Sequence, residues 1–204
     1  AFSPSRFYTD DIAAECMETI FKPTVAAMEK EGRPFKGVLY GGLMKTPDGI
    51  KVIEFNCRFG DPETEVVLPR LESDIFEIFW DVANGIPMPV TKWSSDAVIG
   101  FVLASKGYPG SYKKGVEIKG LDEVLSDPSV KVYHMGTTLK KLGEGHESYD
   151  KAGHSLVTNG GRVLMVLASA PDLKSAHDKA LEAVSKVDCD NLFHRTDIGH
   201  WAFE

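Results

Sequence analysis

The sequence is poor in cysteine and has no long apolar segment. Its 204 residues contain three cysteines, a scattered and odd set that argues against a disulfide framework and favours a reducing, intracellular setting. No apolar run approaches the roughly 20 residues that a membrane helix needs. The first residues, Ala1-Phe2-Ser3-Pro4, lack the charged and apolar segments of a secretory leader. We therefore expect a cytoplasmic (cytosolic) protein that does not bind membranes.

Positive charge is also scarce. Lysine and arginine number 23 against 30 acidic residues, which gives a formal net charge of -7, and the longest basic cluster is Lys140-Lys141. A nucleic-acid-binding surface needs a basic stripe or patch, so we expect no nucleic-acid partner. Apolar residues make up 43% of the chain and charged residues 26%, as in ordinary globular domains. The length allows one large domain or two small ones.

The first part of the chain predicts a helix followed by a β-hairpin. Thr9 or Asp10 can cap a helix that runs to about Glu31. An interruption is expected at Pro23, which lacks the amide hydrogen that a helix interior uses. The turn-forming sequence Thr46-Pro47-Asp48-Gly49 separates two strand-like segments, and this pattern predicts a β-hairpin. The expected strands cover residues 37–44 and 50–56, and apolar spacing predicts another helix over residues 74–84.

A proline-rich linker, Gly85-Ile86-Pro87-Met88-Pro89, separates this part from a second one. Helical spacing of apolar residues predicts an amphipathic helix over residues 172–186, whose apolar face belongs to a core. Together these elements indicate an α+β fold with two domains, residues 1–93 and 94–204. The strands expected in the second domain are dense apolar segments, residues 97–104, 130–134 and 164–169.

The richest polar chemistry lies at the end of the second hairpin strand. Glu54 and Asn56 are two residues apart on a strand, so their side chains share one face. A carboxylate and an amide oxygen are the hard ligands that Mg²⁺ prefers when it also binds substrate phosphates. The alternative is that both side chains only face solvent, and the pair by itself favours that alternative.

The loop after this strand favours a binding site. Arg58 can pair with an anionic substrate group, and Gly60 allows another group to approach the backbone closely. Asp61 and Glu63 can hold an amine, or they can cap a helix that begins near Glu63. We interpret Cys57 as a small packed side chain rather than a nucleophile, because no histidine lies nearby in the sequence.

These motifs resemble those of a known family. The segment Gly37-Val38-Leu39-Tyr40-Gly41-Gly42-Leu43-Met44, followed by residues 52–64, is similar to glycinamide ribonucleotide synthetases (phosphoribosylamine–glycine ligases), which belong to the ATP-grasp superfamily. The resemblance implies a partial ATP-grasp lobe of antiparallel strands and helices over residues 1–93. Residues 94–204 would then be the family's small mixed α/β C-terminal domain. Further similar segments follow in the family's order, at residues 66–71, 104–110, 158–164 and 195–199.

The resemblance also implies roles for the polar residues. Glu54 and Asn56 would be ligands of Mg²⁺, or Mn²⁺, that binds with ATP, and Ile53 would pack on the adenine. The implied reaction joins glycine to 5-phosphoribosylamine through glycyl phosphate, and it converts ATP to ADP and phosphate in purine biosynthesis. Four loop residues would bind the two substrates: Arg58, Gly60, Asp61 and Glu63. Arg58 and Asp61 would also be catalytic.

The same resemblance implies a missing part. Family members begin with a dinucleotide-like domain and a first ATP-grasp lobe, which carry the glycine-rich lid and the lysine over the phosphates, and neither precedes Ala1. We therefore predict an inactive fragment whose partners are these missing N-terminal and ATP-grasp lobes. Two alternatives stay open: another ATP-grasp ligase that joins a different acid and amine, and a non-catalytic piece of a multifunctional purine enzyme.

Overall fold

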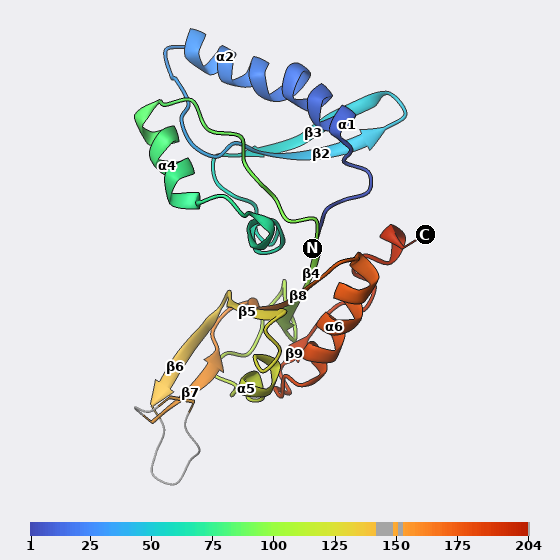
Figure 1. Ribbon diagram of the computed structural model, residues 1–204. Helices are drawn as coiled ribbons and strands as arrows, with labels where there is room; N and C mark the ends of the chain where they lie inside the picture. Colours follow the sequence, from blue (N-terminus) through green and yellow to red (C-terminus); the bar gives the residue numbers. More distant parts are fainter. Residues whose placement is uncertain (142–148, 151–152, 204) are drawn as a thin grey trace. The chain divides into compact units, whose positions relative to one another are not determined.

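The computed structural model describes residues 1–141, 149–150 and 153–203 (Figure 1). The chain forms two compact units. We name them the hairpin unit, Pro4–Thr64 with Arg70–Ser94, and the C-terminal unit, Ala1–Ser3 with Glu65–Pro69 and Ser95–Glu204. Both units combine helices with antiparallel strand pairs, which confirms the expected α+β class.

A long helical segment begins the hairpin unit. Helix α1 (Asp10–Cys16), a π-helical segment η1 (Met17–Phe21) and helix α2 (Lys22–Lys30) follow one another directly. Thr9 caps the segment, because its Oγ1 accepts a hydrogen bond from the amide of Ile12 at 3.5 Å. Pro23 lies in the first turn of α2, where a missing amide hydrogen costs little. The interruption expected at Pro23 therefore takes the form of the preceding π-helical segment.

The predicted hairpin is confirmed. Strands β2 (Tyr40–Thr46) and β3 (Gly49–Asn56) pair antiparallel, from Tyr40 opposite Asn56 to Thr46 opposite Gly49. A bulge interrupts the register, because Gly42 pairs with Glu54 while the next residue, Leu43, pairs with Val52. Ile53 is therefore left without a cross-strand partner, and strict alternation of side chains stops at this residue.

Short helices follow the hairpin. They are α3 (Thr64–Val67), the 3₁₀ segment η2 (Leu68–Arg70) and α4 (Ile75–Asn84). Asp74 caps α4 by accepting a hydrogen bond from the amide of Phe76 at 2.8 Å, and Gly85 ends it with a φ of 69°. The predicted helix is confirmed, but its apolar surface is largely open. Phe76 is 68% exposed and Trp80 58% exposed, and their rings stack at 6.2 Å.

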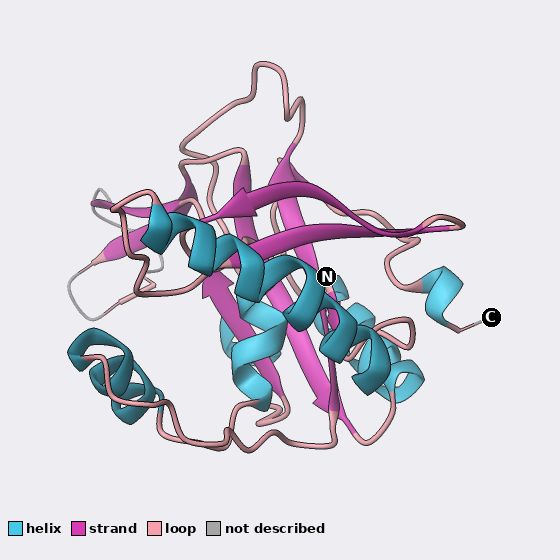
Figure 2. Ribbon diagram, turned by 90° about the horizontal axis from the view of Figure 1, so that it is seen from above, coloured by secondary structure: helices cyan, strands magenta, loops and turns pink. Residues whose placement is uncertain are grey.

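The C-terminal unit contains a five-stranded sheet in the order β1-β4-β8-β5, with β9 also paired to β4. Long strands of this sheet are drawn as magenta arrows in Figure 2. Helix α6 (Leu173–Ser185), labelled in Figure 1, packs against β4 and β8 through residues that include Ala176 and Ala180, so its apolar face belongs to the core as predicted. The smaller elements are helix α5 (Leu121–Val124), the paired strands β6 (Thr137–Lys141) and β7 (His154–Thr158), and the 3₁₀ segment η3 (His200–Ala202). The sheet strands are β1 (Phe2–Ser3), β4 (Ala97–Ser105), β5 (Val130–His134), β8 (Arg162–Ala170) and β9 (Leu192–Phe193).

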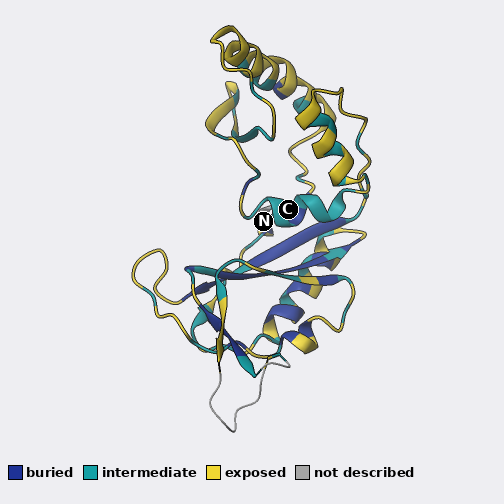
Figure 3. Ribbon diagram, turned by 90° about the vertical axis from the view of Figure 1, so that its left-hand side faces the viewer, coloured by how far each residue is buried: buried dark blue, intermediate teal, exposed yellow. Residues whose placement is uncertain are grey.

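The fully buried apolar residues are distributed unequally between the two units. Among the described residues they lie in the C-terminal unit with a single exception, Cys16. Figure 3 shows the same contrast, with dark blue strands and helix faces in one unit and mainly yellow or teal ribbon in the other. The hairpin unit therefore buries too little apolar surface to supply a hydrophobic core of its own.

Candidate functional site

Glu54 and Asn56 form a side-chain pair at the end of β3. The Nδ2 of Asn56 donates a hydrogen bond to Oε1 of Glu54 at 2.9 Å. Glu54 is exposed and Asn56 is half-buried. The two side chains therefore share one strand face, as the spacing predicts, and the Glu54 side chain is open to solvent.

Tyr40 joins this pair from the neighbouring strand and is not among the residues predicted from the sequence. It lies opposite Asn56 in the β2–β3 register. Burial raises the pKa of the Tyr40 hydroxyl, and the charge of Glu63 together with a hydrogen bond to that carboxylate raises it further. Glu54 acts in the same direction and Arg58 in the opposite one. The phenol therefore lies among three of the predicted site residues, and the cross-strand register is the signal that could have identified it.

Gly60 allows Tyr40 and Glu63 to approach each other. A Cβ on Gly60 would lie 2.4 Å from Oε2 of Glu63 and 3.0 Å from Cε2 of Tyr40, closer than side chains tolerate. The amide of Thr64 donates to the carbonyl of Gly60 at 3.1 Å, so a turn brings Glu63 back over the glycine. The predicted close approach at Gly60 is thus made by the protein's own side chains.

The other predicted residues lie in or beside the same loop. Arg58 is exposed and donates from Nη1 to the carbonyl of Phe59 at 2.7 Å. Asp61 is also exposed, just before the cis peptide bond to Pro62. Ile53, at the bulge, is 64% exposed and presents a bare apolar side chain next to Glu54. The structure therefore brings Tyr40, Glu54, Arg58 and Glu63 together and keeps Ile53 and Asp61 accessible.

The interpretation of Cys57 as a packed residue is wrong. Its side chain is exposed, whereas Cys16 is buried. Strand β3 ends at Asn56, so Cys57 is the first residue of the loop and has no sheet neighbours to pack against. All three cysteines are free thiols.

The Glu54–Asn56 pair fits part of a magnesium site. A carboxylate and an amide oxygen at an exposed strand end match the few protein ligands that Mg²⁺ takes when substrate phosphates and waters complete its shell. The described residues contain no group of three or more His, Cys, Asp or Glu side chains that could hold a metal alone. The donor set therefore suits a metal that arrives with a phosphate-bearing ligand.

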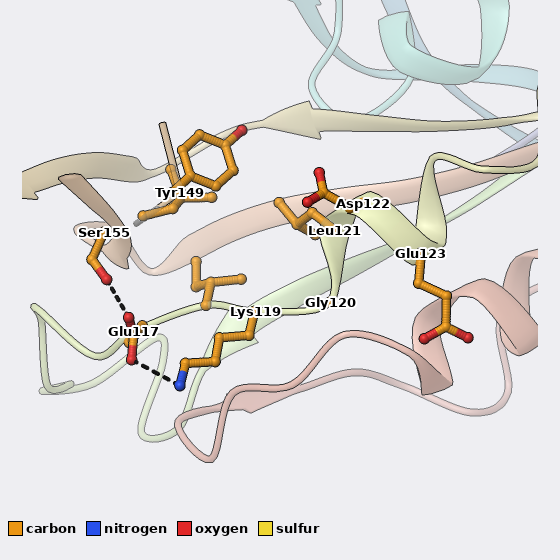
Figure 4. Close-up of a pocket in the computed structure, with 10 residues that line it drawn as sticks. Glu117, Lys119, Gly120, Leu121, Asp122, Glu123, Tyr149 and Ser155 are labelled. Atoms are coloured by element: carbon orange, nitrogen blue, oxygen red, sulfur yellow. Dashed lines mark hydrogen bonds and ion pairs between the residues drawn. The ribbon is translucent and has the colours of Figure 1, made fainter. Parts of the chain in front are cut away.

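A separate pocket in the C-terminal unit does not involve these residues (Figure 4). It has a volume of about 350 Å³ and lies around Gly120 at the start of α5. Three of its polar residues pair with one another, because the Ser155 hydroxyl donates to Glu117 and Nζ of Lys119 lies 3.4 Å from the same carboxylate. None of the residues predicted for the site lines it. The strand-end site in the hairpin unit is therefore the stronger candidate.

Comparison with known proteins identifies the family of the chain. Residues 1–64 match the family model described as "Phosphoribosylglycinamide synthetase, ATP-grasp (A) domain", which places the chain among the ATP-grasp proteins. Residues 98–201 match the model described as "Phosphoribosylglycinamide synthetase, C domain". The chain belongs to the phosphoribosylglycinamide synthetase family, as the resemblance of its motifs predicts. No described helix is long and apolar enough to cross a membrane.

Three similar proteins are each more than twice as long as this chain. A phosphoribosylamine–glycine ligase of Halalkalibacterium halodurans is 45% identical over 199 residues, which are 98% of this chain and 43% of the relative. The trifunctional purine biosynthetic protein adenosine-3 of Gallus gallus is 43% identical over 99% of this chain and 19% of its own length. The crystal structure of a Thermotoga maritima phosphoribosylamine–glycine ligase superposes with a TM-score of 0.78 at 28% identity, over 96% of this chain and 45% of that one. The chain thus spans less than half the length of these relatives.

Proposed function

We propose that this chain is the C-terminal part of an ATP-dependent ligase that joins glycine to 5-phosphoribosylamine and forms glycinamide ribonucleotide in the cytosol. Residues 1–93 would be the C-terminal part of its ATP-grasp domain and residues 94–204 its C-terminal domain. Family membership and the printed names of the relatives support the reaction. The three free thiols support a reducing compartment.

The observation that carries the proposal is the 2.9 Å hydrogen bond between Asn56 and Glu54 beside the loop that contains Arg58 and Glu63. Glu54 and Asn56 would hold Mg²⁺, or Mn²⁺, which when bound neutralises the charge of the ATP phosphates. Ile53 would cover one face of the adenine with its exposed side chain. The strand end would thus fix the nucleotide.

The loop residues would handle the two other substrates. The carboxylate of glycine attacks the γ-phosphorus of ATP and ADP leaves, which gives glycyl phosphate. The amine of 5-phosphoribosylamine then attacks the acyl carbon, phosphate leaves, and the amine loses a proton. Arg58 would pair with an anionic group of the reacting substrates, and Asp61 and Glu63 would accept hydrogen bonds from the amines. Gly60 would take part through the turn, because its missing side chain lets the Glu63 carboxylate reach its position.

The chain alone would not catalyse this reaction. An ATP-grasp site encloses the nucleotide between two lobes, and this chain corresponds to 43% and 44% of two of the curated ligases that it matches. The partners that complete the site would be the remaining lobes of the same enzyme. We expect no ligation by the isolated chain, and no stabilisation by millimolar magnesium–ATP of the size that saturation of a tight site gives.

A multifunctional protein is a second candidate for the source of this chain, because the Gallus gallus relative is named as trifunctional. The ligase chemistry of the site would be unchanged in that setting. The length of the encoded polypeptide distinguishes the two cases: a length near that of the bacterial relatives supports a single ligase, and a much longer one supports the fusion.

The ligase can be tested in a chimera in which this chain replaces the matched 199-residue stretch of the Halalkalibacterium halodurans relative. The chimera should form glycinamide ribonucleotide from glycine, 5-phosphoribosylamine and ATP. Glu54→Gln should lower turnover by about 100-fold or more, because the negative charge that attracts the metal ion is lost. Asp48→Asn changes an exposed carboxylate in the hairpin turn and should leave turnover unchanged. Full activity of Glu54→Gln would refute the metal-ligand assignment, and ligation of another acid in place of glycine would refute the substrate.

A further inference from the structure

The helical segment of the hairpin unit buries very little of its own surface. Across α1, η1 and α2, the sole fully buried residue is Cys16, and α2 buries none. Helices in proteins draw most of their stability from packing of an apolar face rather than from intrinsic propensity. A helical segment of this length with one buried residue is therefore incomplete as a packed element.

One face of this segment borders an apolar groove. Met17, Phe21 and Val25 follow one another at four-residue spacing, so they form a stripe along the helix. Leu39 before β2 and Met88 in the linker also line the groove, which has a volume of about 610 Å³. We name these residues, with Lys22, Ala26, Glu29 and Gly37, the helix groove.

The floor of the groove is fixed by close packing between the helix and the hairpin. Phe21 lies on the backbone of β2, where a Cβ on Gly41 would be 2.9 Å from Cζ of Phe21. The same ring meets Phe55 of β3 edge-on at a centroid distance of 6.5 Å. Phe21 is therefore packed against the hairpin, while three other lining residues are exposed: Met17 by 45%, Val25 by 38% and Met88 by 55%.

The lining suits a polypeptide better than a small polar ligand. Lys22 and Glu29 are its charged members, and both are exposed residues of the helix rather than buried groups that converge on one point. Small-molecule sites combine apolar walls with several convergent polar groups. An open apolar channel beside a helix is typical of a surface on which protein side chains pack.

We propose that the helix groove is filled by apolar side chains from the part of the same enzyme that this chain does not include. Eight of its nine lining residues lie between Met17 and Leu39, inside the stretch that matches the ATP-grasp domain model. The bacterial relatives carry more than half of their length outside the matched region, 57% in the relative that is 43% covered. The apolar side chains that fill the groove would then come from this further stretch, and the inference rests on the proposed function, which makes that stretch part of the same enzyme.

Methionine oxidation in the chimera and in the isolated chain tests the proposal without any activity measurement. Met17 lines the groove and is 45% exposed, while Met28 is on the same helical segment, outside the lining, and 36% exposed. In the isolated chain, dilute peroxide should oxidise both at similar rates. In the chimera, Met17 should be protected about 10-fold or more and Met28 should react as before. Equal rates in the chimera would overturn the proposal.

A matched pair of variants gives an independent readout. Met17→Gln should lower the thermal midpoint of the chimera by about 4 °C or more and leave the isolated chain unchanged, because the polar side chain is buried only in the chimera. Met28→Gln should be neutral in both, since glutamine and methionine have similar helix propensities. A concentration-dependent protection of Met17 in the isolated chain, with a doubled mass, would identify a second copy as the occupant and refute the proposal. Loss of ligase activity with Met17 still protected would count against the proposed function instead.

Discussion

Tyr40 and Glu63 meet over Gly60, although one lies at the start of β2 and the other lies beyond the end of β3. This contact is possible because Gly60 has no side chain: a Cβ there would lie 2.4 Å from the Glu63 carboxylate and 3.0 Å from the Tyr40 ring. The phenol hydroxyl donates to Glu63, and the charges of Glu54 and Arg58 also act on it. The hairpin thus links the predicted metal-binding pair on β3 to the loop expected to bind the other substrates.

Tyr40→Phe should change the alkaline stability of the chain. The pKa of Tyr40 is raised, first by burial and then by Glu63, so folding favours the protonated phenol. Its contribution to the free energy of unfolding is present below the usual tyrosine pKa of about 10 and is lost as the pH rises through the folded-state value. Denaturant unfolding between pH 8 and pH 11 (roughly the window around that pKa) should show a smaller loss of stability in the variant. Identical pH profiles would contradict this contact.

Gly60→Ala supplies a control for the same contact. The methyl group should displace the Glu63 carboxylate and remove the hydrogen bond from Tyr40, so the two single variants break one interaction from opposite sides. The double variant should then be less destabilised than the sum of the single variants, as expected for residues in direct contact. Strict additivity would mean that Gly60 and Tyr40 act separately.

The hairpin could be predicted from sequence because its signals are local. A strong turn sequence lies between two strand-like segments, and two-residue spacing is enough to place Glu54 beside Asn56. Tyr40 was missed because its contact with Glu63 depends on strand pairing across 23 residues and on the turn at Gly60. The bulge at Ile53 was missed for the same reason, since it is a property of the register between two strands and not of either strand alone.

The C-terminal unit shows the same division between local and distant signals. The strand over residues 130–134 was predicted with the bounds that the structure has, because a dense apolar segment is a local signal. Strands β1 and β9 contain two residues each, which is too short for any periodicity. Strands β6 and β7 pair mainly with each other and carry mixed polar side chains, so they lack the apolar run of a core strand. The exposure of Cys57 likewise depends on where β3 ends.

Substitution of two phenylalanines should show which unit holds the core. Phe101 is fully buried and lies edge-on to His177 at 5.5 Å, so Phe101→Ala should cost about 3 to 5 kcal/mol of unfolding free energy. Phe76 in the hairpin unit is 68% exposed, and Phe76→Ala should change stability by no more than about 0.5 kcal/mol. Chemical denaturation of both variants measures the difference. Equal costs would mean that the hairpin unit has a packed core after all.

Asp172 should stabilise helix α6 as a cap in a pH-dependent way. Its carboxylate accepts hydrogen bonds from the amide of Ser175 at 2.8 Å and from the Ser175 hydroxyl at 2.7 Å, and these lower its pKa. A lowered pKa means that the contribution is present above the unfolded-state value of about 3.9 and is lost as the pH falls through the folded-state value. Asp172→Ala should therefore lower the thermal midpoint at pH 7 and have a smaller effect at acid pH.

Asp172→Asn is the matched control, because asparagine caps helices about as well as aspartate but does not titrate. At pH 7 it should remain close to the original chain. Below the folded-state pKa of Asp172, the original chain should lose stability relative to the asparagine variant. The carboxylate cap would be ruled out if the alanine variant were as stable as the original chain at neutral pH.

The three thiols should react with an alkylating reagent in a fixed order. Cys57 is exposed at the start of the site loop and should be modified first. Burial raises the pKa of Cys189, which is half-buried, so less of its reactive thiolate is present and it should react more slowly. Cys16 is fully buried, burial raises its pKa as well, and it should react only when the helical segment opens. Peptide mass analysis after timed labelling at pH 8 gives the order.

Because Cys57 follows Asn56 directly, its labelling in the active chimera should slow when magnesium–ATP is added. An unchanged rate would place the nucleotide away from the end of β3.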